Sequence, residues 1–268
     1  LTGYFIPVSV PVMDLSAASE TADTTYYDMI HKDCQKDEAA DFRVKKYQLD
    51  FSVGLNLTGS AKVYVDRSEL KSYRFTLYHG YKVKQVTDQT GAALDFRREY
   101  DYVTVTRGGA AVEYLCLEYT GKSPKYYSSY AGVCLPANFA YYPIPGYREL
   151  FKDNFYGFID CSLPYDTAFD VRCSGRKQMY CNLAARGDNH FAGNARSITL
   201  LSGYYDTLKL NDTLVVYPKY ADTEIQAKIK KNMGTFTKEH RDIRTIFIMG
   251  ADNLTPYEHL RSYDGYLV

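Results

Sequence analysis

Strict alternation of apolar and polar residues near position 50 constrains the fold of this chain most. Apolar residues occupy every second position there: Tyr47, Leu49, Phe51, Val53, Leu55 and Leu57. Successive side chains of a strand point to opposite faces of a sheet, so this pattern predicts a long strand with one buried face. Gly59 then predicts a turn, and Ala61, Val63 and Val65 alternate again, which indicates a β-hairpin.

Further short apolar stretches follow as far as about residue 220. They lie at residues 73–78, 82–87, 102–106, 112–119, 155–162, 168–173, 197–201 and 213–217. Such closely spaced strands, with turns between them, are typical of an antiparallel β-sandwich. The 28 tyrosines agree with this interpretation, because Tyr favours strands. We therefore predict a mainly β fold, with a β-sandwich over residues 41–220 and a polar loop over residues 186–194 within it.

The two ends of the chain differ from this central part. A capping residue at position 222 or 223 precedes Ile225, Ile229, Met233 and Phe236, whose spacing predicts one apolar face of a helix. A short apolar run at residues 245–249 then predicts a buried strand. Residues 221–268 are thus expected to form a helix-strand α/β appendage.

Residues 1–40 show no sustained periodicity, and we interpret them as a linker or membrane-proximal segment. The first twelve are mostly apolar and include two prolines, which is similar to the exit from a transmembrane helix. No apolar run in the sequence approaches the roughly 20 residues that a helix needs to cross a bilayer.

The overall charge argues against one class of partner. The 32 basic and 32 acidic side chains cancel, so the chain has no global attraction for nucleic acids. We predict no nucleic-acid partner.

The six cysteines are scattered and include no Cys-x-x-Cys pair. A disulfide among Cys161, Cys173 and Cys181 is compatible with their spacing in an oxidising compartment. The sequence alone leaves their redox state open.

Catalytic motifs are absent from the sequence. A zinc peptidase helix carries His-Glu-x-x-His, and none of the five histidines is paired at that spacing. The triplet His240-Arg241-Asp242 matches a kinase catalytic loop, but Phe247 stands where that loop has a magnesium-binding Asn. We predict no catalytic residue, no metal site and no cofactor in this chain.

The tripeptide Arg186-Gly187-Asp188 is the sequence that integrins read, and it lies in a polar stretch. Three residues specify little, so we interpret this match as coincidence.

Tyrosines gather in and beside the Pro-rich segment 120–147. Flat aromatic faces stack on sugars and peptides, and loops on rigid sheets are common binding sites. This favours a binding surface for a peptide, a protein or a cell-surface polymer, while packing within the fold is the competing interpretation. The candidate binding residues are Tyr126, Tyr127, Tyr130, Tyr141, Tyr142 and Tyr147.

Several segments together resemble the amino-terminal β domain of aminopeptidase-N-type (gluzincin) metallopeptidases. They lie at residues 47–53, 59–65, 75–80, 83–86, 117–121, 141–146 and 155–164. In that family the first four of these segments build the first sheet of a β-sandwich. The segment at 117–121 resembles a later strand end, the segment at 141–146 an aromatic-Tyr-Pro stretch, and the segment at 155–164 the strand that follows it. The helix and strand expected between residues 225 and 249 are similar to the first elements of the family's catalytic domain, so the resemblance covers roughly residues 41–250.

Two departures from the family pattern bear on function. The zinc-binding helix and the Gly-x-Met-Glu-Asn substrate strand are both missing, so the resemblance supplies no catalytic or metal-binding residue. Bacterial membrane proteins related to ABC transporter permeases carry similar regions outside the membrane. The resemblance therefore implies a non-catalytic, extracytoplasmic domain of such a protein, tethered to the membrane by flanking segments and serving ligand or partner recognition. The alternatives are the accessory domain of a truncated zinc aminopeptidase and a carbohydrate-binding module.

Overall fold

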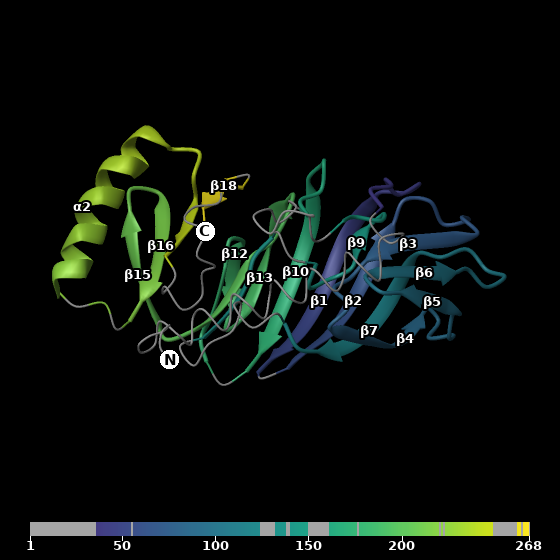
Figure 1. The fold of residues 1–268 in the computed structure, drawn as a ribbon. Helices are drawn as coiled ribbons and strands as arrows, with labels where there is room; N and C mark the ends of the chain where they lie inside the picture. The colour runs from purple at the N-terminus through teal and green to yellow at the C-terminus, as the bar shows by residue number, and fades with distance from the viewer. Residues whose placement is uncertain are drawn as a thin grey trace.

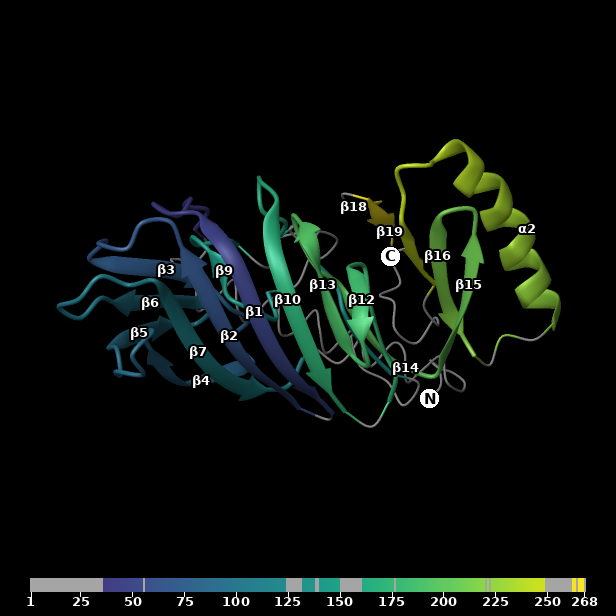
Figure 2. The ribbon, with the colours of Figure 1, turned by 180° about the vertical axis from the view of Figure 1, so that it is seen from behind.

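The structure is a computed structural model that describes most of the chain after residue 35. The described residues are 36–54, 56–123, 132–137, 140–149, 161–175, 177–219, 221, 223–248, 262–263 and 265–267. Within them the chain forms strands grouped into four sheets, and one helix, α2 (Thr223–Glu239). Figures 1 and 2 show an elongated molecule, with α2 at one end and the four-stranded sheet near the other.

The largest sheet has seven strands. Their order is β12 (Ala184–Gly187), β13 (His190–Ala195), β10 (Thr167–Ser174), β1 (Val44–Val53), β2 (Leu57–Val65), β7 (Tyr114–Gly121) and β4 (Tyr81–Thr87). Neighbouring strands are antiparallel, except that β1 and β10 are parallel. The predicted β1–β2 hairpin is confirmed.

Gly59 does not form the turn of that hairpin, as the sequence had predicted. The turn lies between Val53 and Leu57, and Gly59 pairs with Phe51 inside the ladder. A Cβ atom on Gly59 would lie 2.5 Å from Cζ of Tyr119 on β7. This glycine therefore leaves room for a buried ring, which is a packing role that the local sequence does not reveal.

The segment predicted as a polar loop at residues 186–194 instead contains most of the β12–β13 hairpin. All four residues of β12 are exposed, because β12 is an edge strand of the sheet. An edge strand without a buried face lacks the alternation that marks a strand in the sequence.

Two smaller sheets pack against one face of the large sheet. The four-stranded sheet has the order β5 (Phe96–Glu99), β6 (Tyr102–Thr106), β3 (Ser72–Thr76) and β9 (Ile144–Pro145). The three-stranded sheet has the order β11 (Met179–Cys181), β14 (Leu200–Gly203) and β8 (Gly132–Leu135). Leu49, Phe75, Val105, Leu135 and Leu200 belong to one buried cluster that joins all three sheets. The prediction of a mainly β fold with packed antiparallel sheets is confirmed.

The C-terminal part forms a separate five-stranded sheet with α2 on it. Its order is β15 (Tyr205–Leu210), β16 (Thr213–Pro218), β17 (Thr245–Phe247), β19 (Tyr266–Leu267) and β18 (Ser262–Tyr263). Ile229, Met233 and Phe236 of α2 pack against Val215 and Ile246, which confirms the predicted helix and strand. Because β15 and β16 belong to this sheet, it begins before residue 221, where we placed the start of the appendage.

Helix α2 is neither long nor apolar enough to cross a membrane, and the described residues include no helix that is. Residues 1–35 lie outside the described residues, as does most of the strand predicted at residues 155–162.

Candidate functional site

Three of the six candidate tyrosines, Tyr126, Tyr127 and Tyr130, lie outside the described residues. Tyr141 and Tyr142 are in the core, with 0% and 1% of their surface exposed. Their packing is that of core residues: the Tyr141 hydroxyl donates to the carbonyl of Ile198 (2.9 Å), and the Tyr142 ring meets that of Tyr47 edge-on at 5.4 Å. Ligand binding by this set of tyrosines stays a prediction.

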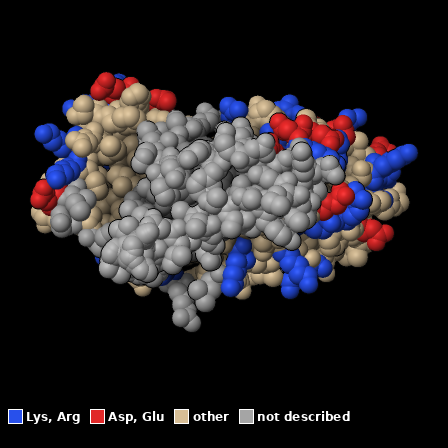
Figure 3. All heavy atoms as spheres, viewed as in Figure 1, with Lys and Arg blue, Asp and Glu red and all other residues tan. Residues whose placement is uncertain are grey.

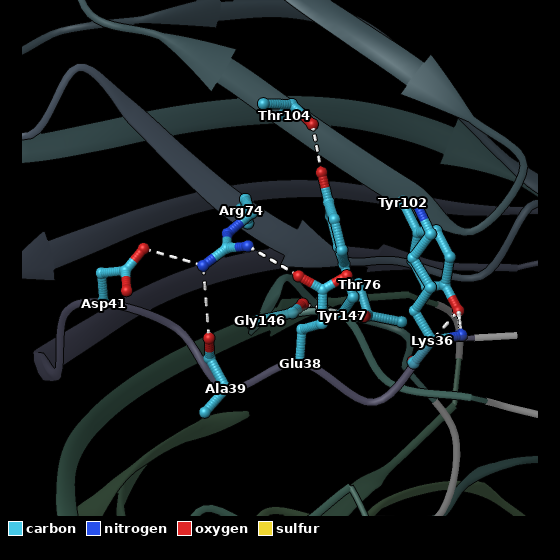
Figure 4. Close-up of polar contacts among 10 residues, drawn as sticks. All are labelled: Lys36, Glu38, Ala39, Asp41, Arg74, Thr76, Tyr102, Thr104, Gly146 and Tyr147. Carbon is cyan, nitrogen blue, oxygen red and sulfur yellow. Dashed lines mark hydrogen bonds and ion pairs between the residues drawn. The ribbon is translucent and has the colours of Figure 1, made fainter. Parts of the chain in front are cut away.

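Tyr147 lies beside the segment where the described chain begins (Figure 4). Its hydroxyl shares a hydrogen bond of 2.6 Å with that of Thr104, and its ring centroid is 4.6 Å from that of Tyr102. The Arg74 guanidinium lies 5.5 Å from the Tyr147 ring centroid, within the range of a cation–π contact.

Residues 36–41, which we call the N-terminal strap, are fastened to this cluster. Arg74 pairs with Glu38 (2.9 Å) and Asp41 (2.7 Å), and the backbones of Glu38 and Tyr147 exchange two hydrogen bonds. Gly146 has a φ of +88°, and a Cβ atom there would lie 2.5 Å from the Glu38 carbonyl oxygen. Tyr147 thus helps to hold the strap against β3 and β9, as Figure 4 shows.

A hollow lined by described residues lies on the other face of the seven-stranded sheet. There the polar residues that alternate with core residues form rows across the strands, as expected for a sheet with one solvated face. Register places Glu118, Ser60, Asp50, Arg172 and His190 in one such row, on β7, β2, β1, β10 and β13. Thr120, Thr58, Ser52 and Ser174 form the next row.

These rows border a pocket of about 640 Å³, which we call the outer-face groove. Its lining residues are Asp50, Phe51, Ser52, Thr58, Gly59, Ser60, Lys84, Glu118, Tyr119, Thr120, Arg172, Cys173 and Ser174.

The hydroxyl groups of the groove are tied to the sheet. Thr58 and Thr120 share a hydrogen bond of 2.8 Å between their Oγ1 atoms, and Thr120 can also donate to the Leu57 carbonyl at 3.1 Å. Ser174 donates to the Phe51 carbonyl at 3.3 Å. These contacts fix the polar end of the groove on rigid strands.

The charged groups of the groove differ in their partners. Glu118 accepts a hydrogen bond from Gln85, and Arg172 lies 3.6 Å from Asp170, which also contacts His190 at 3.0 Å. Asp50 and Lys84 are exposed, and within the described part of the chain neither side chain makes a hydrogen bond or ion pair. The groove therefore offers an exposed carboxylate and an exposed ammonium group without a partner among the described residues.

Cys173 borders this groove, but it lies in register with Phe51 and packs against the buried core on the inner face of the sheet. Burial, helped by the negative charge of Asp50, raises the pKa of the Cys173 thiol to about 12. A thiol with so high a pKa stays protonated at neutral pH and is a poor nucleophile. The groove is thus suited to binding through charges and hydrogen bonds.

A His–Asp pair with a buried carboxylate lies elsewhere, between the end of β3 and the start of β6. Asp101 is fully buried, and its Oδ1 atom accepts hydrogen bonds from the backbone nitrogen of His79 (2.6 Å) and lies 3.1 Å from its Nδ1. Burial lowers the pKa of nearby Arg98 to about 10, and the Asp101 charge opposes that shift. No group of three His, Cys, Asp or Glu side chains suited to a metal ion occurs in the part of the chain that the structure describes.

Sequence reasoning missed both the outer-face groove and the His79–Asp101 pair. The alternation at residues 48, 50 and 52 shows that Asp50 faces away from the core, but the strands that flank it are 10 to more than 100 residues away along the chain. For His79 and Asp101, 22 positions apart, the sequence holds no signal.

Of the comparisons with known proteins, only the one with solved structures finds a likeness. No protein-family model matches this sequence, and no curated protein matches it. Among solved structures, leukotriene A4 hydrolase from Saccharomyces cerevisiae aligns with a TM-score of 0.58 and 11% identity, over 85% of this chain and 40% of the hydrolase. An M1 zinc metallopeptidase from Deinococcus radiodurans aligns with a TM-score of 0.53 and 13% identity, over 86% of this chain and 61% of the peptidase.

This chain thus spans less than two thirds of the length of either neighbour. At such low identity the likeness concerns the fold alone. None of these comparisons bears on a permease context. The described residues have the fold of the amino-terminal β domain of M1-type zinc peptidases, followed by a helix on a further sheet.

Proposed function

We propose that this chain is a non-catalytic recognition module and that its outer-face groove binds an extended, charged peptide segment of a ligand or partner protein. The observation that carries the proposal is the pair of exposed charges, Asp50 and Lys84, that have no partner in the described part of the chain and border a hollow of about 640 Å³. Complementary charges on a ligand would give both specificity and faster association.

The lining of the groove favours a peptide over a neutral sugar. Its two aromatic residues, Phe51 and Tyr119, are buried with 2% and 1% exposure, so neither offers a ring face for stacking. A neutral ligand would also cover Asp50 or Lys84 without pairing it, which carries a desolvation cost. These features argue against the carbohydrate-binding alternative at this groove.

The likeness to M1-type peptidases supports a second candidate, the accessory domain of a zinc aminopeptidase. The sequence of the intact open reading frame separates the two candidates. A His-Glu-x-x-His motif after residue 268 would favour the peptidase. Flanking transmembrane spans without that motif would favour a membrane-tethered recognition domain. The extracytoplasmic, permease-associated setting rests on residues 1–12 and on the family resemblance, and it stays a prediction.

Binding to an array of peptides of about twelve residues tests the groove. The double variant Asp50→Asn with Lys84→Gln should weaken binding of the captured peptides about 10-fold, because two exposed ion pairs contribute up to about 1 kcal/mol each. The matched control is Glu69→Gln with Lys71→Gln, an exposed pair between β2 and β3 that lies outside the groove lining. Equal binding by both double variants, or binding to a glycan array alone, would contradict the proposal.

A further inference from the structure

The tripeptide Arg186-Gly187-Asp188, which the sequence alone suggests is a coincidence, lies at the tip of the β12–β13 hairpin. Gly187 pairs with His190, which leaves Asp188 and Asn189 as the turn, and Asn189 has a φ of +53°. All three residues of the tripeptide are exposed. A Cβ atom on Gly187 would meet nothing within 4 Å, so the space beside this residue is open.

A break in register separates Arg186 from the regular ladder. Ala185 pairs with Phe191 and Gly187 with His190, so Arg186 is the extra residue of a bulge. Bulges re-aim side chains at sheet edges. Neither the Arg186 guanidinium nor the Asp188 carboxylate has a hydrogen-bond or ion-pair partner among the residues that the structure describes.

The tip is anchored immediately after the tripeptide. The backbone oxygen of Asn189 accepts a hydrogen bond from the backbone nitrogen of Cys173 (2.9 Å). Its Oδ1 atom accepts one from the backbone nitrogen of Met179 (3.2 Å). Asn189 thus joins the turn to β10 and β11, and a loop held in this way loses little conformational entropy when it binds.

We propose that this hairpin tip is an adhesion ligand for a receptor of the integrin class. The Asp188 carboxylate would complete the coordination of a divalent cation held by the receptor, since carboxylate oxygens are preferred ligands of such ions. The Arg186 guanidinium would pair with a receptor carboxylate in a two-pronged hydrogen bond. Gly187, which has no side chain, lets the receptor approach the backbone between them.

This inference goes beyond the recognition proposed for the groove and can fail independently of it. Direct binding of the purified chain to the purified ectodomain of an Arg-Gly-Asp-reading integrin, in Mn²⁺ and in EDTA, tests it. We expect saturable binding in Mn²⁺ that EDTA abolishes and that a soluble Arg-Gly-Asp peptide displaces. The variant Asp188→Glu keeps the charge but moves the carboxylate, and it should weaken binding at least about 30-fold, as expected for a central interface contact.

The β15–β16 hairpin supplies the matched control. Asp212 is an exposed turn residue there, next to Asn211 with a φ of +54°. The variant Asp212→Glu, and the groove variant Asp50→Asn with Lys84→Gln, should bind the integrin as the unchanged chain does. Thermal unfolding of each variant checks that the fold is kept. Absence of saturable binding, or equal binding by the Asp188→Glu and Asp212→Glu variants, overturns the proposal.

Discussion

The two faces of the seven-stranded sheet differ although the same strands build both. On β1, the inner residues Tyr47 and Leu49 are buried in the core, whereas Gln48 and Asp50 point the other way and reach solvent. The inner face holds three sheets together through rings and aliphatic side chains. The outer face carries hydroxyls and charges that contribute little to that packing, and it is therefore available for recognition.

The charged side chains on one side of the molecule give no comparable focus. Figure 3, viewed as Figure 1, shows Lys and Arg interspersed with Asp and Glu on the described residues of that side. A mixed surface agrees with the zero net charge of the chain and provides no broad field to steer a ligand. Recognition by this domain would therefore depend on local features such as the outer-face groove.

Truncation of an inner-face ring gives the largest expected contrast between the faces. The Tyr47 ring stacks on Phe169 at 5.0 Å, and its hydroxyl donates to the Pro143 carbonyl at 2.8 Å. Tyr47→Ala should lower the free energy of unfolding by about 3–5 kcal/mol, as for other large aromatic residues in cores. Ser52→Ala on the outer face should change it by less than about 0.5 kcal/mol. Urea unfolding of both variants measures the contrast, and similar losses would contradict it.

A smaller effect is expected where the inner face has no room for a side chain. Gly59→Ala places a methyl group about where the Tyr119 ring lies, so the ring or the strand must shift. We expect a loss of about 1–3 kcal/mol, the usual cost of overpacking a core. Gly109→Ala is the control, because a Cβ atom at Gly109 meets nothing within 4 Å. If both variants unfold at the same urea concentration, Gly59 does not have the packing role assigned to it.

A feature of the fold could be predicted from the sequence where the residues that mark it lie close together along the chain. Alternation along β1 and the apolar stripe of α2 are local, and both elements were predicted. The role of Gly59 depends on Tyr119, which is 60 positions away, so the turn was misplaced. Strand β12 has no buried face and therefore no alternation to recognise.

The candidate sites were harder to predict than the strands. Tyr141 and Tyr142 have the same aromatic character whether they serve a core or a binding surface, and only the fold shows that they are buried. The outer-face groove requires the register between β1, β2, β7 and β10, which no single segment of the sequence contains. Long-range pairing therefore decides the site even where local patterns predict the strands.

The smallest of the three expected changes in the free energy of unfolding comes from alkaline pH, which acts on a buried thiol of the inner face. Burial raises the pKa of the Cys173 thiol to about 12 in the folded chain, against an ordinary value of 9.0. A raised pKa means that the folded state favours the protonated thiol, so its stabilising contribution is complete below about pH 9 and is lost as the pH rises toward 12. Between pH 9 and pH 10 the free energy of unfolding should fall by about 1 kcal/mol from this group.

Cys181 adds to the same trend, because burial raises the pKa of its thiol to about 12 as well. Urea unfolding at pH 7, 8, 9 and 10 tests this, and the interval from pH 7 to pH 8 serves as the control in which neither thiol contributes. Cys173→Ala should make the decline above pH 9 less steep even if it lowers stability at every pH, because the alanine side chain cannot ionise while Cys181 still can. A variant whose stability falls as steeply as that of the unchanged chain would show that this thiol does not sense the buried environment of the inner face.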